Sequence, residues 1–372
     1  MREFSISNRE KFRRIDPVIL LCVLGMNILS IITLASAADA YGSWYVKVQI
    51  FASVVSILVM FVITFIDYDA LFQKLKFAFF AASIILIIIV KIWGTGSNGN
   101  ENWISFGNVS IQPTELVKVT FMITFALHLD RVKDKINHPL SILQLALHAG
   151  LIIGMVLWQG DLGMALVYMA IMAFMLFGAG VSMWYFAGVA GMVLIASPFA
   201  WSVLTEKQQM RIIAGFNPEL DPLGSGWHAL RSRDAIIAGG FRGAGFSGGT
   251  QYAKLWGGQS DFLFSVLAEK FGFLGTLLYI VLIVTLIIRI LLLARQTRKK
   301  YASYICVGIA GMLIAQAVEN IGMCLALLPV VGITLPFFSY GASSILSMYI
   351  CVGILQSICT HNKKYYFERE TQ

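Results

Sequence analysis

Residues 205–261 read TEKQQMRIIAGFNPELDPLGSGWHALRSRDAIIAGGFRGAGFSGGTQYAKLWGGQSD, and they form one polar segment in an otherwise apolar chain. Apolar stretches long enough to cross a bilayer lie on both sides, at 182–204 and 262–294. Connections between helices are usually short, so a long segment rich in Gly and Arg is expected to carry function. The sequence therefore predicts a membrane protein with one large outer loop.

The composition supports this prediction. The 372 residues are 58% hydrophobic and 13% charged, with a mean hydropathy of +0.77. A soluble domain cannot bury that much apolar surface, so we expect an all-α polytopic membrane protein, a single domain over 1–372. About ten transmembrane helices are predicted, with the large loop between the seventh and the eighth: 17–38, 44–66, 77–93, 113–129, 141–158, 161–178, 182–204, 262–294, 302–328 and 333–360.

Basic residues predict the orientation. Lys and Arg cluster in the first tail (1–16), after the second, fourth and eighth spans, and in the last tail (361–372). Ten spans with both termini in the cytoplasm place all these clusters inside, as the positive-inside rule requires. The net charge of +8 then reflects topology, and we expect no nucleic-acid binding. The loop at 205–261 lies outside, where its own basic residues indicate an anionic ligand.

Two carboxylates border the eighth span. Asp261 opens the segment DFLFSVLAEKFGFLG, and it either caps the helix that follows or acts at the outer membrane boundary. Its position beside a long cationic loop favours a functional role. Glu269, two turns further along the predicted helix, either pairs with a buried cation or belongs to the same cavity.

The loop also carries arginines among glycines. Arginine matches phosphate oxygens, and glycine allows backbone amides to approach an anion, so a phosphate site is expected here. The alternative is contact with anionic lipid headgroups. The candidate side chains are Arg211, Arg231, Arg233 and Arg242. No nucleotide-binding G-x-x-x-x-G-K-[ST] loop is present in the sequence.

A second outer segment, at 94–118, precedes the fourth span. Trp103 is either an interfacial belt residue or an apolar platform under a sugar. Glu115 and Lys118 lie three residues apart on one helical face, where an ion pair serves either bundle stability or a cavity. Asp161, in WQGDLGMA, stands at a break between spans.

Five collinear stretches make the chain resemble the SEDS family (shape, elongation, division and sporulation), which includes RodA, FtsW and SpoVE. They are NWISFGNVSIQPTELVK, WQGDLGMAL, MRIIAGFNPELDPLGSGWHALRSRDAIIAGG, SDFLFSVLAEKFGFLG and NIGMCLALLPVVGITLPFFSYGASS. The resemblance covers about residues 15–358. It implies a peptidoglycan glycosyltransferase that polymerises lipid II on the outer face of the bacterial plasma membrane.

The resemblance also implies partners and roles. The usual partner of the family is a class B penicillin-binding protein transpeptidase, alongside other elongation or division proteins. The family's catalytic aspartate falls on Asp261. The other motif positions, expected to bind substrate, fall on Trp103, Glu115, Lys118, Arg211 and Glu269. Many members have P-E-x-H-T before the aspartate, whereas this chain has Gly257, Gly258, Gln259 and Ser260, so substrate contacts there are expected to differ.

The expected chemistry suits these residues. A sugar 4-hydroxyl needs a base such as Asp261 to remove its proton, whereas a pyrophosphate leaving group needs positive charge rather than an acid. Direct displacement inverts the anomeric centre. A divalent cation, Mg²⁺ or Mn²⁺, could share the pyrophosphate charge, although no ligand cluster in the sequence demands one. Two alternatives remain: a flippase for lipid II, which needs a polar path through both leaflets, and a non-catalytic scaffold of the elongation or division machinery.

Overall fold

The computed structural model describes residues 12–94, 102–106, 109–224 and 226–361. Within these ranges ten long helices follow the ten predicted spans, and they confirm an all-α polytopic membrane fold. The predicted tails at 1–16 and 361–372 lie mostly outside the described residues. The long helices are α2 (Pro17–Ser36), α4 (Ser43–Phe65), α5 (Tyr68–Trp93), α6 (Pro113–Val132), α7 (Pro139–Trp158), α8 (Leu162–Gly178), α9 (Met183–Val203), α12 (Leu263–Gln296), α13 (Lys300–Cys324) and α14 (Ala342–His361).

Eight of these helices are long and apolar enough to cross a membrane. The other two are α8, which has 17 residues, and α6, which carries several charged residues. Helix starts follow local chemistry: proline stands at the first position of α2, α6 and α7, where its missing N–H costs nothing. The carboxylates of Asp16 and Asp161 cap α2 and α8 by accepting from backbone amides.

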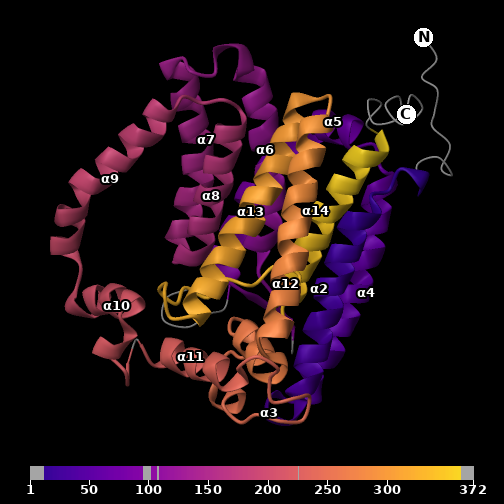
Figure 1. The fold of residues 1–372 in the computed structure, drawn as a ribbon. Helices are drawn as coiled ribbons and strands as arrows, with labels where there is room; N and C mark the ends of the chain where they lie inside the picture. Colours follow the sequence, from indigo (N-terminus) through magenta and orange to yellow (C-terminus); the bar gives the residue numbers. More distant parts are fainter. Residues whose placement is uncertain (1–11, 95–101, 107–108, 225, 362–372) are drawn as a thin grey trace.

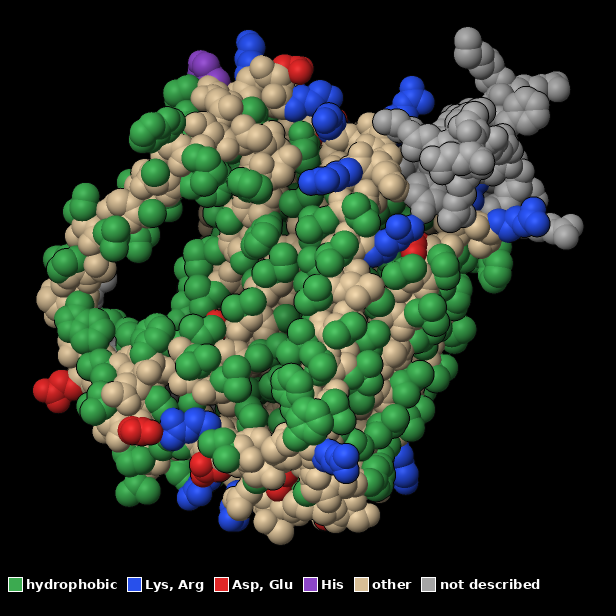
Figure 2. Space-filling view, in the orientation of Figure 1, with side chains coloured by type: hydrophobic (Ala, Val, Ile, Leu, Met, Phe, Trp, Pro, Cys, Tyr) green, Lys and Arg blue, Asp and Glu red, His purple; other side chains and the backbone are tan. Residues whose placement is uncertain are grey.

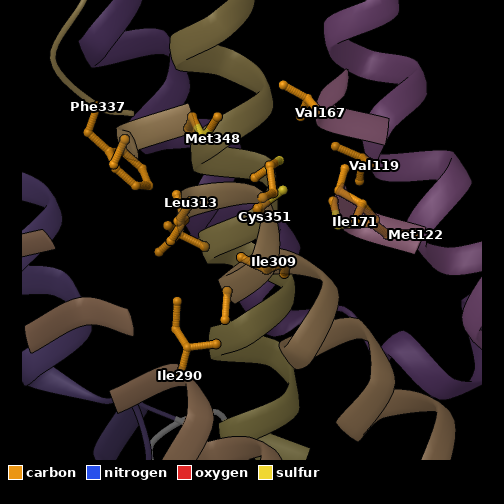
Figure 3. Close-up of a cluster of buried hydrophobic side chains, with 14 of the residues drawn as sticks. Val119, Met122, Val167, Ile171, Ile290, Ile309, Leu313, Phe337, Met348 and Cys351 are labelled. Carbon is orange, nitrogen blue, oxygen red and sulfur yellow. The ribbon is translucent and has the colours of Figure 1, made fainter. Parts of the chain in front are cut away.

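The centre of the bundle is formed by α13 and α14 (Figure 1). Helix α14 packs against α4 and α6, whereas α13 packs against α12, α8 and α6. Figure 3 shows the apolar side chains that meet between these helices, including Met122, Ile171, Ile309, Leu313 and Met348. Figure 2 shows hydrophobic side chains along the sides of the bundle and Lys and Arg side chains mainly toward its two ends, as expected for a membrane protein.

Helix α9 differs from the others because it stands away from the bundle. None of its membrane-length window is buried, and Figures 1 and 2 show open space between it and the rest of the bundle. Most of its apolar side chains are therefore exposed, although Tyr185 and Phe186 near its start pack against the core.

The segment predicted as a loop at 205–261 contains helices. They are α10 (Glu206–Phe216), the 3-10 turn η2 (Pro218–Leu220), α11 (Trp227–Gly239) and the 3-10 turn η3 (Tyr252–Lys254). The remaining short elements are α3 (Ala38–Tyr41), η1 (Lys133–Lys135) and a hairpin of β1 (Ile104–Phe106) with β2 (Val109–Ile111), in which Ser105 pairs with Ser110.

The eighth span was predicted to begin at residue 262, and α12 begins at Leu263, but the helix is not continuous. At 34 residues α12 would be about 51 Å long if straight, well over the ~30 Å hydrocarbon core. The helix breaks at Gly272, whose φ of 64° and ψ of −161° are not helical. The part that can span is therefore 273–296, and residues 263–271 form a separate short helical segment.

Two other predicted boundaries also shift. The third span begins at Tyr68 instead of residue 77. The last begins at Ala342 instead of residue 333, because residues 325–341 form no helix. Side chains replace the helical hydrogen bonds in this stretch: Tyr279 donates to the Pro336 carbonyl at 3.1 Å, and Asn320 donates to the Ile333 carbonyl at 2.7 Å.

Candidate functional site

Asp261 lies in a turn at 257–262, directly before the short helical segment 263–271. Backbone amides of Ser260 and Phe262 donate to the Gly257 carbonyl and close the turn. The Asp261 carbonyl accepts from Asn320 Nδ2 at 2.8 Å. These bonds fix the backbone of Asp261, and none of them involves its carboxyl group.

The Asp261 carboxyl group has no hydrogen bond or ion pair among the described residues, although the residue is half-buried. The capping alternative is therefore wrong: the residue before the helix is Phe262, and no side chain caps it. Burial raises the pKa of Asp261 from its ordinary 3.8 to about 6, because the charged form loses hydration. A carboxylate in this state remains ionised at pH 7 and is a stronger base than an exposed one.

The extended segment 325–341 passes beside this carboxylate. A Cβ added to Gly332 would lie 3.5 Å from Asp261 Oδ2, so the chain is within contact distance there. The Tyr340 amide donates to the Gln259 carbonyl at 3.2 Å. Asn320 joins both pieces, since its Nδ2 also donates to Ile333. Sequence reasoning did not single out Asn320; the signal was an amide side chain inside an apolar span.

Helix α11 covers the short segment from the other side. Ser232 Oγ lies 2.5 Å from Ser265 Oγ, and the His228 ring stacks on Phe262 at 6.2 Å between centroids. A Cβ on Gly239 would lie 1.9 Å from the Ala268 carbonyl oxygen, so only glycine permits this approach. This chain lacks the histidine of the family's P-E-x-H-T motif before Asp261, and α11 brings His228 next to Phe262, the residue after Asp261.

The Glu269 side chain is buried, and backbone amides donate hydrogen bonds to both of its carboxylate oxygens. Its Oε1 accepts from the amides of Thr250 and Gln251 at 2.7 and 2.8 Å, and its Oε2 accepts from the Tyr252 amide. The side chain is 1% exposed. Its substrate role stays a prediction, whereas its observed contacts hold the loop before Asp261.

The glycines after α11 were predicted to bring amides to an anion, and for Gly243 and Gly245 this is wrong, because their amides donate to backbone carbonyls. The amides of Ala244 and Gly245 donate to the carbonyls of Glu269 and Lys270, at 2.8 and 2.9 Å. In return the Phe273 amide donates to the Gly240 carbonyl at 2.9 Å. This loop therefore replaces the helical hydrogen bonds that the break at Gly272 removes.

Glu115 and Lys118 form a buried ion pair of 2.7 Å near the start of α6. Ser347 of α14 donates to Glu115 Oε2 at 2.8 Å. Next to this pair, Gln112 donates to the Asp161 carboxylate at 2.8 Å, so Asp161 joins α6 to α8. The amino ends of α6, α8 and α14 thus meet in one polar layer.

The predicted arginines have different environments. Arg231 lies 3.5 Å from Asp234 and 5.9 Å from the centroid of the Trp227 ring. Arg233 pairs with Glu219 at 3.1 Å. The Arg233 side chain is 38% exposed, whereas Ser232, which contacts α12, is fully buried. Arg242 follows α11, is exposed, and has no ion pair among the described residues.

The two remaining predicted residues are Trp103 and Arg211. Trp103 lies on the hairpin that leads into α6 and is 37% exposed. Arg211 is in α10, and its side chain lies outside what the structure describes. Among the described residues no three His, Cys, Asp or Glu side chains converge. The residues around Asp261 therefore do not form a protein ligand set for the predicted Mg²⁺ or Mn²⁺.

Known proteins are similar to this chain in sequence and in fold. The FtsW/RodA/SpoVE family model, described as cell cycle protein, matches residues 14–364. The chain is 32% identical to the probable peptidoglycan glycosyltransferase FtsW of Trichlorobacter lovleyi, covering 94% of this chain and 95% of that protein. It is 33% identical to the peptidoglycan glycosyltransferase MrdB of Escherichia coli K12, covering 94% of each.

A solved chain agrees with these relatives. It comes from a peptidoglycan synthase complex studied for the coordination of polymerization and crosslinking. That chain matches the present fold with a TM-score of 0.82 at 27% identity, covering 94% of this chain and 98% of that chain. With the family model over nearly the whole sequence and these relatives, the chain belongs to the FtsW/RodA/SpoVE family, which is the SEDS family that its motifs resemble.

Proposed function

We propose that this SEDS glycosyltransferase uses Asp261 as the general base that extends a glycan strand from lipid II on the outer face of the plasma membrane. The observation that carries the proposal is the state of the Asp261 carboxyl group. It is half-buried, it has no hydrogen-bond partner among the described residues, and its pKa is raised to about 6. A paired carboxylate would have to give up its partner before it could accept a proton.

The reaction needs one base and a cationic environment. The 4-hydroxyl of one sugar attacks the anomeric carbon of the next, and Asp261 takes the hydroxyl proton as the new bond forms. The bond to undecaprenyl pyrophosphate breaks, and the leaving group departs as an anion that needs no protonation. Direct displacement inverts the anomeric centre. A second catalytic carboxyl group, as in glycosidases, is therefore not required.

Positive charge near the leaving group comes, in this proposal, from the outer segment. Of the three arginines whose side chains are described, Arg242 is the one without an ion pair to a described residue, so it can accept a new anion directly. Arg231 would have to give up its ion pair with Asp234 to bind the pyrophosphate, and Arg233 would have to give up its ion pair with Glu219. Arg211, Trp103 and the Glu115–Lys118 pair are proposed as further substrate contacts.

The flippase alternative draws on the buried Glu115–Lys118 pair, which places charge at membrane depth. Immediately below that pair the interior is apolar. Val119 and Met122 of α6 pack with Ile171 of α8 and Cys351 of α14 (Figure 3), and all four side chains are at most 6% exposed. A polar headgroup would have to displace this cluster, so the arrangement favours polymerisation over transport.

We also propose that the chain works with a class B penicillin-binding protein transpeptidase and other elongation or division proteins, with both of its termini in the cytoplasm. Support for the partner comes from the matching chain of a peptidoglycan synthase complex. Support for the orientation comes from the sequence, in which Lys and Arg cluster in both tails and after the second, fourth and eighth spans.

The test is polymerisation of fluorescent lipid II by the purified full chain, with and without a cognate transpeptidase. Asp261→Asn should insert and fold normally but polymerise about 10²–10⁴-fold more slowly, the usual effect of losing a general base. Glu219→Gln, which alters an exposed carboxylate of the same outer segment, serves as the control and should retain activity. Near-normal polymer formation by Asp261→Asn would remove Asp261 from the mechanism.

The same proteins in liposomes test the alternatives. A flippase would move labelled lipid II between leaflets whether or not polymer forms. A scaffold would support cell growth when Asp261 is replaced by Asn.

A further inference from the structure

A cavity of about 380 Å³ lies between α5, α6 and α7, at the end of the bundle away from Asp261. It is open to the outside of the bundle, and Phe77 at its edge is 78% exposed. Its volume is within the usual range for small-molecule sites. None of the residues proposed for glycan synthesis lines it.

Two helical stripes face each other across this cavity. Helix α5 contributes Gln73, Lys76 and Phe80, and α6 contributes Thr124, His128 and Arg131. Each stripe follows the three- and four-residue spacing of one helix face. Because α5 starts and α6 ends at this end of the bundle, Lys76 and Arg131 lie at the mouth. Phe80 and Thr124 lie one to two turns deeper, about 6–10 Å along the helices.

The mouth carries positive charge that the protein does not neutralise. Lys76 and Arg131 have no salt bridge among the residues that the structure describes. Lys76 has only a contact with the Phe77 ring, at 5.4 Å from its centroid. The one acidic residue in the lining, Asp130, already pairs with Lys133 at 3.1 Å. Two cations are therefore available to an anion.

The deeper wall supplies weaker polar groups. His128 Nδ1 lies 3.1 Å from His148 Nδ1, so one ring donates and the other accepts. His148 Nε2 lies 3.4 Å from Thr124 Oγ1. The His128 Nε2 atom has no hydrogen bond among the described residues and can bind a ligand oxygen. The cations at the mouth and the polar atoms below them match the phosphate and the ester groups of a phospholipid, and the exposed Phe77 at the edge matches its apolar chains.

We propose that this cavity binds the headgroup of an anionic glycerophospholipid, with its phosphate between Lys76 and Arg131. A soluble phosphate compound would carry the same charge, but it has no apolar chain that could contact the exposed Phe77. The positive-inside rule places the site in the cytoplasmic leaflet. The bound lipid would link α5 to α6, two helices that also frame the outer hairpin.

The test is native mass spectrometry of the full chain in detergent, titrated with phosphatidylglycerol, phosphatidylcholine or inorganic phosphate. The unmodified chain should retain one phosphatidylglycerol more tightly than phosphatidylcholine and should not retain phosphate. Lys76→Ala/Arg131→Ala should bind phosphatidylglycerol about 30-fold more weakly, as expected for the loss of two cations near an anionic headgroup. Lys76→Arg/Arg131→Lys preserves the charge and should bind.

The matched control is Lys74→Ala/Arg298→Ala, which removes two exposed basic residues from outside the cavity. It should bind as the unmodified chain does. Equal weakening in this control would mean that surface charge alone attracts the lipid, and would overturn the proposal. Unchanged binding by Lys76→Ala/Arg131→Ala would overturn it as well. Equally tight, Lys76-dependent binding of inorganic phosphate would reassign the cavity to a soluble anion.

Discussion

The two ends of the helical segment 263–271 hold carboxylates in opposite states. At the far end Glu269 accepts three backbone hydrogen bonds and is almost fully buried. At the near end the carboxyl group of Asp261 accepts no hydrogen bond from the described residues, and the residue is partly exposed. A buried charge without partners costs stability, whereas a charge with three donors contributes to it. The difference indicates that Glu269 stabilises the fold, whereas Asp261 is available for chemistry.

The largest expected effect on stability is at the structural end. In Glu269→Gln the new amide group must face a backbone N–H, because both carboxylate oxygens now accept from amides. We expect a loss of about 1–3 kcal/mol in the free energy of unfolding. Thermal unfolding of the purified chain measures this loss. Asp261→Asn is the comparison and should unfold at the same temperature or higher; a larger loss there would reverse the assignment of the two carboxylates.

The next effect is a pH dependence specific to Asp261. Its pKa of about 6 means that the base is ionised at pH 7 and largely protonated at pH 5. We expect the polymerisation rate at pH 5 to be about tenfold below that at pH 7. Initial rates over pH 5–8 would check it, and a flat profile would argue against Asp261 as base.

The stability of the folded chain should depend on the ionisation of Asp261 in the opposite direction, decreasing as the pH rises. The folded chain holds the Asp261 proton more tightly than the unfolded chain does. This residue's contribution to folding is thus fully present below pH 4 and is lost as the pH rises toward 6.

The smallest effect is expected on the outer side of α11. Arg233→Ala removes an exposed ion pair with Glu219, so stability should change by no more than about 0.5 kcal/mol. Polymerisation should stay within about twofold, because the side chain is partly exposed and already paired with Glu219. Arg242→Ala is the informative partner in the same assay. A larger loss in Arg233→Ala than in Arg242→Ala would show that Glu219 releases Arg233 to the substrate.

Much of the fold could be predicted from apolar length alone. The helix bounds at Pro113, Pro139 and Met183 lie within two residues of the predicted starts, because proline and polar caps mark them. The break at Gly272 could not be predicted in this way. It depends on hydrogen bonds from residues about thirty positions earlier in the chain, and no local pattern reports them.

The candidate site shows the same limit. Asp261 was identified from its position at the end of a polar segment, and its family motif agrees. Its neighbours were harder to identify, since Asn320 and Gly332 come from the ninth span and the segment after it. For Glu269 the sequence left a buried ion pair and a place in the cavity open, and the folded loop at 250–252 shows that backbone amides are its partners.

The exchange of hydrogen bonds at Gly272 has a consequence for local unfolding. The amides of Ala244 and Gly245 are bonded to one side of the break, and those of Phe273 and Leu274 are bonded to carbonyls of Gly240 and Phe241. Neither strip of backbone can detach without exposing the polar groups of the other at the lipid boundary. These four amides should therefore exchange with deuterium as one cooperative unit, and the start of the long helix and the loop at 240–245 would open together.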